Sequence, residues 1–373
     1  MKKIWIIVGI VVAVALAISI IVIQTKKGPE EIKIGAILPL TGNVGIFGEW
    51  IKNGMNLALE KIEKNEPELE GTIKIIYEDS QNDAKMGISA LNKFLSIDKI
   101  DIVVSAMSKV SIPLIPITEE KKIPLFMQDV TYPEITKKGE MVFRHFIQSD
   151  REASILAEYA INHLDVRTVG ILYVNDEAGL GAKESFSKVI TMLYGRVLNI
   201  ESYEVTDTDM KSQIIKVISA KPDGIYLFGN GPSWAVTLKQ IKEIGYRGVI
   251  LTNTAMYIPN FRQIAGKESI EGVYFTYPYM DTTEKSVQEF VNLYKEKFGE
   301  DPPIESAYAW DIIQIIAKAQ KERGDNLFEK LLNVKILEGA FGILQIHEDR
   351  DIKTAVGIGI IKNGEIMPIS VRK

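Results

Sequence analysis

The sequence predicts an α/β protein built from two similar lobes in tandem. Its length of 373 residues suggests two domains. Short apolar runs alternate with segments whose apolar residues recur at helical spacing, and this alternation starts again near Arg151. Strands that alternate with helices favour a largely parallel sheet with helices on both faces.

The first series predicts four strands and three helices. Its first helix is typical, because Ile51, Met55, Ala58 and Ile62 recur three or four residues apart and define one apolar face. In chain order we expect strand 31–40, helix 48–63, strand 72–79, helix 83–95, strand 100–105, helix 109–120 and strand 123–128.

The second series repeats this pattern. We expect helix 152–164, strand 168–176, helix 182–194, strand 196–205, helix 210–220, strand 223–230, helix 233–245 and strand 248–254. Later residues predict two more helices, 284–299 and 307–322, and a hairpin-like β segment, 342–366. Late elements of this kind often return to the first lobe, so we expect a multi-stranded connection between the lobes.

The N-terminus carries an apolar run, Ile4 to Ile23, that contains no charged residue. About 20 apolar residues can span a bilayer as a helix. A cleaved signal peptide usually has a shorter apolar core followed by a small-x-small site. We therefore expect residues 1–28 to be an uncleaved membrane anchor, with a cleaved signal segment as the alternative. Both interpretations place the rest of the chain outside the cytoplasm.

Polar or small residues follow the carboxyl ends of many predicted strands, the edge at which open α/β sheets bind ligands. At one of these ends, Ser105, Ser108 and Ser111 surround a predicted helix start, where free N–H groups favour an anion. Two such edges that face each other would form a cleft. The segments are 41–43, 105–111 and 128–131 in the first lobe, and 175–177, 229–231 and 252–254 in the second.

The sequence offers little support for catalysis, metal binding or nucleic-acid binding. It has no cysteine, and His145, His163 and His347 lie far apart, so no metal-ligand spacing is present. There is no nucleophile-elbow or P-loop motif. The net charge of −5 gives a nucleic-acid partner no support. We therefore predict a protein that is not an enzyme and needs no cofactor or metal.

Four blocks of sequence have a familiar order and spacing. They are IKIGAILPLTGNVGIFGEWIKNGMNLALEKI from Ile32, the block from Ser105 to Ala153 that begins SAMSKVSIPLIP, GILYVNDEAGLGAKESF from Gly170, and AYAWDIIQIIAKA from Ala307. Together they resemble the Leu/Ile/Val-binding proteins, the type I periplasmic receptors of branched-chain amino-acid ABC transporters. The resemblance covers about Ile32 to Lys362.

The resemblance implies the type I periplasmic binding protein fold, in which two Rossmann-like lobes are joined by three crossovers and close on a small ligand. The crossovers are expected near Ser149, near Tyr277 to Met280 and near Val334 to Leu337. The first lobe would then comprise residues 29–148 and 279–334, and the second residues 149–278 and 335–373.

The resemblance also implies a site. Ser108 aligns with the serine that holds an amino acid's carboxylate, Thr131 with the threonine that assists, and Phe47 with an aromatic wall. Thr254 stands where the family has an acid that pairs with the ligand ammonium. Two pocket tyrosines of the family fall on Ala178 and Asn230.

Asp129 stands where the family usually has a small residue. If its side chain points inward, it could pair with a ligand ammonium. If it points outward, the pocket is nearly uncharged and suits an amide or a urea-like solute. The sequence leaves both interpretations open.

These features predict a monomeric solute-binding receptor that captures a small polar solute, with a branched-chain amino acid as the first choice, and delivers it to an ABC permease. One alternative is a ligand-sensing ectodomain that acts with a separate signalling partner. Another is a binder of amides or urea-like solutes.

Overall fold

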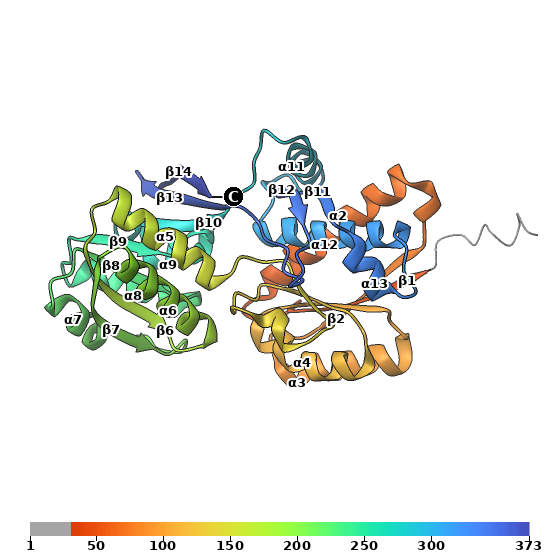
Figure 1. The fold of residues 1–373 in the computed structure, drawn as a ribbon, viewed down its shortest axis with the longest axis horizontal. Helices are drawn as coiled ribbons and strands as arrows, with labels where there is room; N and C mark the ends of the chain where they lie inside the picture. The colour runs from red at the N-terminus through yellow and green to blue at the C-terminus, as the bar shows by residue number, and fades with distance from the viewer. Residues whose placement is uncertain (1–30, 373) are drawn as a thin grey trace, which may run out of the picture.

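The computed structural model describes residues 31–372 and confirms the predicted α/β class with two lobes. Figure 1 shows the two lobes side by side, each with its own sheet and helices. The predicted membrane anchor at 1–28 lies outside the described residues. Within the described part of the chain, no helix has the length and apolar character that a membrane crossing requires.

The first lobe contains a five-stranded parallel sheet in the order β2-β1-β3-β4-β5. Ile34 and Val104 face one side, Ile37 and Val103 face the other, and all four are fully buried. The sheet is therefore covered on both faces, as parallel sheets require. Its strands are β1 (Ile32–Leu38), β2 (Ile73–Asp79), β3 (Ile102–Ala106), β4 (Leu125–Gln128) and β5 (Val142–Arg144).

Helices α2 and α12 pack together on one face of this sheet, and α3 and α4 cover the other. Gly54 permits the close approach of α2 to α12, because a Cβ there would lie 2.1 Å from the Ser306 carbonyl oxygen. The contact fixes the N-terminal turn of α12. The helices of this lobe are α2 (Gly45–Asn65), α3 (Ala84–Lys93), α4 (Ser108–Lys121), α11 (Lys285–Phe298), α12 (Ile304–Lys321) and α13 (Leu327–Asn333).

The second lobe contains a seven-stranded sheet in the order β14-β13-β10-β9-β8-β6-β7. Strands β13 and β14 pair antiparallel, and the five other strands are parallel. The strands are β6 (Thr168–Val174), β7 (Arg196–Tyr203), β8 (Gly224–Phe228), β9 (Val249–Thr252), β10 (Tyr274–Pro278), β13 (Val356–Lys362) and β14 (Glu365–Arg372).

Six helices accompany this sheet. Trp234 on α8 and Phe186 on α6 are fully buried in its core. The helices are α5 (Ser149–His163), α6 (Glu177–Met192), α7 (Lys211–Ser219), α8 (Gly231–Glu243), α9 (Pro259–Ala265) and α10 (Lys267–Ile270).

The chain passes between the lobes three times. The first passage joins β5 to α5 through residues 145–148, and the second joins β10 to α11 through 279–284. The third leads into β13 through residues 353–355. This third passage lies later than Val334 to Leu337, where we expected it.

The reason is a two-stranded ribbon, β11 (Ile336–Gly339) and β12 (Gly342–Gln345), that packs on α11 and α12. Phe341, Leu344 and Ile352 are buried in the core of the first lobe. Residues 335–352 therefore belong to the first lobe, and of the late strands only β13 and β14 join the second-lobe sheet. The expected assignment of 335–373 to the second lobe is corrected accordingly.

A buried ion pair ties the first and third passages to the first lobe. Arg144, which is fully buried, donates from Nε to Asp351 Oδ1 at 2.6 Å and from Nη2 to Oδ2 at 2.9 Å. The adjacent His145 lies 3.0 Å from Asp311 Oδ2 on α12 and 3.0 Å from the Ile352 carbonyl oxygen. The end of β5 and the segment before β13 are thus joined directly.

Replacing one partner of this ion pair leaves the other charge buried. We expect Asp351→Asn to lower the free energy of unfolding by about 3 kcal/mol. Glu120→Gln, which removes an exposed ion pair with Lys121, is the control and should leave it nearly unchanged. Urea unfolding of the two variants measures both values. Equal stability of the two variants would show that the buried pair does not secure the connection.

Candidate ligand-binding site

Strand register brings Ser108 and Asp129 together. Ala106 at the end of β3 pairs with Gln128 at the end of β4, and the Met107 N–H donates to the Gln128 carbonyl oxygen at 3.1 Å. Met107 and Asp129 both have left-handed backbones, with φ of 71° and 55°. Such conformations are uncommon for residues other than glycine and cluster at functional sites.

Ser108 begins helix α4 with its polar groups free. Neither its hydroxyl nor the backbone N–H groups of Ser108 and Lys109 have an acceptor among the described residues. Ser105 and Ser111, by contrast, are buried and satisfy each other through a 2.7 Å hydrogen bond. Ser108 is therefore the serine available to a ligand, and the helix dipole favours a negative group there.

A carboxylate that the sequence interpretation missed lies in the second lobe. Glu152, in the first turn of α5, is only 1% exposed. Its Oε2 accepts hydrogen bonds from the Thr254 N–H at 3.1 Å, the Thr254 hydroxyl at 2.8 Å and the Thr276 hydroxyl at 2.7 Å. Its Oε1 is buried and has no partner.

Thr254 thus holds an acid near the position where the resemblance led us to expect one. The sequence contained a weak signal for it. Glu152 lies four residues before Leu156, on the face of α5 that buries Ala153 and Ala160, and an acid on an apolar helix face is unusual.

Two further carboxylates lie in the first lobe. Glu305, in the first turn of α12, is 4% exposed, and Asp129 is half-buried with its Oδ2 enclosed and unpartnered. Burial, and then the charge of Glu305, raises the pKa of Asp129 well above its usual value. The Gln128 side chain donates from Nε2 to the Glu305 carbonyl oxygen at 2.7 Å, which places Asp129 beside the start of α12. The charges of Asp129, Glu152 and Glu305 all contribute to raising the pKa of Tyr308, after burial.

These acids lack a cation. Among residues 31–372, no lysine, arginine or histidine forms an ion pair with Asp129, Glu152 or Glu305. Arg151 instead donates to the Thr354 carbonyl oxygen. Burial raises the pKa of Glu152 to about 7, against the hydrogen bonds from the two threonines, and raises that of Glu305 to about 7. Because buried unpaired charge is unfavourable, the group suits a positively charged ligand.

The structure places the four other expected site residues outside the group of three acids. Phe47, on α2, packs against the core of the second lobe, and the Thr131 carbonyl oxygen accepts from the N–H of Ser149 at 2.9 Å. Ala178 is 8% exposed in the second-lobe core, and Asn230 is exposed at the start of α8. The Asn230 side chain forms no hydrogen bond with the acids in the described chain, and the Ala178 methyl group has no polar atom.

The lobes touch each other on this side. Phe47 of the first lobe reaches the second-lobe core, and a Cβ at Gly181 of α6 would lie 2.5 Å from Pro133 Cγ of the first lobe. We define the interlobe site as Ser108, Asp129, Glu152, Thr254 and Glu305. Ser108, Asp129 and Glu305 come from the first lobe, and Glu152 and Thr254 come from the second.

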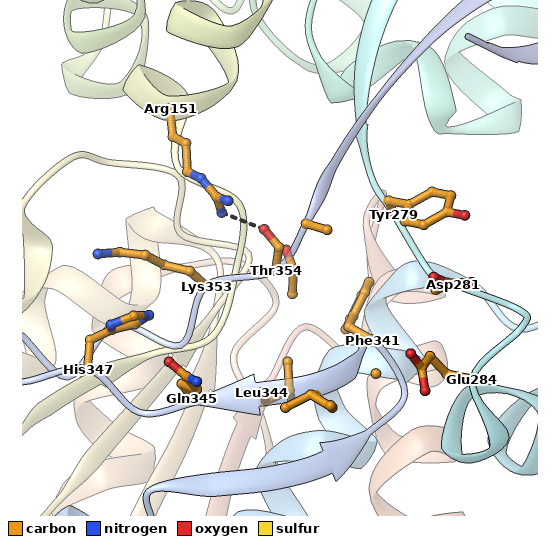
Figure 2. Close-up of a pocket in the computed structure, with 13 residues that line it drawn as sticks. Arg151, Tyr279, Asp281, Glu284, Phe341, Leu344, Gln345, His347, Lys353 and Thr354 are labelled. Atoms are coloured by element: carbon orange, nitrogen blue, oxygen red, sulfur yellow. Dashed lines mark hydrogen bonds between the residues drawn. The ribbon is translucent and has the colours of Figure 1, made fainter. Parts of the chain in front are cut away.

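A separate pocket of about 540 Å³ lies beside the second and third passages. Figure 2 shows Arg151, Lys353 and His347 on one side of it and Glu284 on the other, with Phe341 between them. None of the seven expected site residues lines this pocket. Phe341, one of the residues that line it, packs against Tyr308 with ring centroids 4.4 Å apart.

Two α/β lobes, three passages between them and a charged site where they meet define a two-lobed solute-binding protein. Residues 31–364 match the family described as periplasmic binding protein. The chain belongs to this family, which implies an extracytoplasmic location for its described part.

Similar proteins share nearly the whole length of the chain. A Leu/Ile/Val-binding protein homolog of Brucella melitensis is 25% identical over 333 residues, covering 88% of this chain and 86% of the relative. A leucine-binding protein of Thermotoga maritima has a TM-score of 0.81 at 25% identity, covering 91% of this chain and 98% of that one. A solute-binding protein of R. palustris, solved with 4-hydroxybenzoate, has a TM-score of 0.80 at 19% identity, covering 92% and 97%.

The close approach of Gly181 to Pro133 gives a test of whether the two lobes touch in solution. Gly181→Val adds a side chain that collides with Pro133, so we expect the lobes to stay further apart and the radius of gyration to rise. Small-angle scattering would measure the radius of gyration of the Gly181→Val variant, of the wild type and of Glu184→Ala, an exposed change on the same helix. All three proteins would be measured with the solute that most raises the melting temperature of the wild type. Equal radii for all three proteins would show that this contact does not form in solution.

Proposed function

We propose that this protein is an extracytoplasmic receptor that captures a small solute with an amino group and delivers it to an ABC transporter permease. An α-amino acid is the first choice, and a branched-chain one is favoured by the names of the relatives. The R. palustris protein, described as part of an ABC transporter, supports the partnership with a permease.

One observation carries the choice of an amino group. The interlobe site has a free helix N-terminus at Ser108 in the first lobe and the unpartnered Glu152 Oε1 in the second. A ligand carboxylate fits the first group and a ligand ammonium fits the second. An aromatic carboxylate such as 4-hydroxybenzoate has no positive group to offer Glu152, so the acids disfavour it.

Hinge closure supplies the mechanism. We assign residues 31–144, with 285–352, to one rigid lobe, and residues 149–278, with 356–372, to the other. A ligand that contacts Ser108 and Glu152 at the same time bridges the lobes, and it therefore stabilises the closed state relative to the open one. Capture needs no cofactor and no chemical step.

The proposal also includes attachment to the membrane and a monomeric state. The apolar segment within residues 1–28 would keep the receptor at the membrane beside its permease. A monomer would leave both lobes free to contact the permease.

A thermal-shift screen of the full-length protein tests this function. The panel is L-leucine, L-isoleucine, L-valine, L-lysine, cadaverine, acetamide, urea and 4-hydroxybenzoate, and we expect only compounds with an amino group to raise the melting temperature. For an amino-acid ligand, Ser108→Ala should weaken binding by about 1–3 kcal/mol through the lost hydrogen bond to a charged group.

Glu152→Gln should weaken the binding of every amino compound, whereas Glu158→Gln, an exposed change on the same helix, should not. Calorimetric titration of these variants measures the affinities. A shift with urea, acetamide or 4-hydroxybenzoate alone, or with no compound, would refute the proposed function.

A further inference from the structure

We propose that Asp129 and Glu305 form a second cation-binding subsite, so that the solute carries two cationic groups, as a diamino acid or a short diamine does. This inference rests on the proposed function, because it assigns the ligand chemistry of the same interlobe site. In this proposal Glu152 binds one cationic group from the second lobe, and the Asp129–Glu305 pair binds the other from the first.

Among residues 31–372, neither the Asp129 nor the Glu305 carboxylate accepts a hydrogen bond from another residue. Glu305 is 4% exposed, and the only group that donates to its carboxylate is its own backbone N–H. Asp129 Oδ2 is enclosed without a hydrogen bond. No hydrogen bond joins the two side chains in the described structure, so they do not satisfy each other as a proton-sharing pair would.

An independent observation points to a ligand at the same place. Glu152 is only 1% exposed, yet its Oε1 has no hydrogen-bond partner in the described chain. The hydroxyl of the fully buried Tyr226 also has no partner there. The charge of Glu152 contributes to raising the pKa of Tyr226, after burial. Buried polar groups usually have hydrogen-bond partners, so the free Glu152 Oε1 points to a group that binds there.

The charge balance then decides the class of solute. A zwitterionic amino acid such as leucine brings one positive and one negative group, which leaves the net charge around Tyr308 unchanged. Arg151 is a cation that also interacts with Tyr308, so three acids act on this tyrosine together with one cation. A solute with two cationic groups offsets the remaining negative charge, so the larger stabilisation belongs to the solute with more positive charge.

Aromatic rings favour the same class. Tyr257 stacks on Tyr277 with centroids 5.5 Å apart, and the charge of Glu305 contributes to raising the pKa of Tyr257, after burial. Ring faces next to carboxylates attract organic cations. Among residues 31–372, no set of three or more histidine, aspartate or glutamate side chains could hold a metal ion, so an organic cation is favoured over a metal.

Isothermal titration calorimetry of the full-length protein tests the subsite, with L-leucine, L-lysine, L-ornithine, cadaverine and putrescine as probes. We expect L-lysine, L-ornithine or a diamine to bind roughly tenfold or more tightly than L-leucine. Asp129→Asn and Glu305→Gln should each reduce the affinity for that probe roughly tenfold, with little effect on L-leucine. Retained binding in Ser108→Ala would identify a diamine, and lost binding a diamino acid.

The matched control is Glu296→Gln, which removes an exposed acid on α11. Neither test variant removes a hydrogen bond or an ion pair to another described residue, so their melting temperatures should not fall, which guards against misfolding as the cause. If L-leucine binds at least as tightly as every dicationic probe, or if the two variants bind those probes like the wild type, the subsite is refuted while the receptor function stands. If no probe binds, the proposed function itself is refuted.

Discussion

The buried ion pair between Arg144 and Asp351 determines where the chain crosses between its lobes. It joins the end of the first sheet to the segment that leads into β13, so two of the three passages start from one fixed point. Helix α5 begins five residues after Arg144, and this placement brings Glu152 up to Thr254 and Thr276. The position of the second-lobe carboxylate thus depends on a contact made entirely in the first lobe and its connections.

The three carboxylates give the site a defined response to pH. The pKa of Glu152 is about 7 in the folded protein and near 4.5 when exposed, so between these values the folded state holds a proton that the unfolded state has lost. With respect to this group, the free energy of unfolding of the free protein is therefore greatest below about pH 4.5. It falls by on the order of 3 kcal/mol as the pH rises from about 4.5 to about 7. A bound cation reverses this effect, because it favours the ionised carboxylate.

The sequence predicted most of the fold but only part of the site. Apolar runs and helical spacing located the elements, and the polar strand ends located Ser108 and Asp129, because both signals are local. The destination of β11 and β12 depends on packing against α11 and α12, which no local pattern reveals. Glu152 and Glu305 were missed for a similar reason. Each looks like an ordinary acid in the first turn of a helix, and only the tertiary fold shows that it is buried without a cation.

The central claim is that a ligand cation ionises Glu152 and Glu305, whose pKa values of about 7 leave them largely protonated in the free protein at about pH 6. Asp150, Tyr226 and Tyr308 are the other titratable groups that interact with Glu152, and none of them supplies a positive charge. The direct measurement is the binding enthalpy of the tightest solute at about pH 6 in phosphate and in MES, whose ionisation enthalpies differ. We predict that binding releases roughly one proton or more at about pH 6 and fewer protons at about pH 8. Equal enthalpies in the two buffers at about pH 6 would contradict the account.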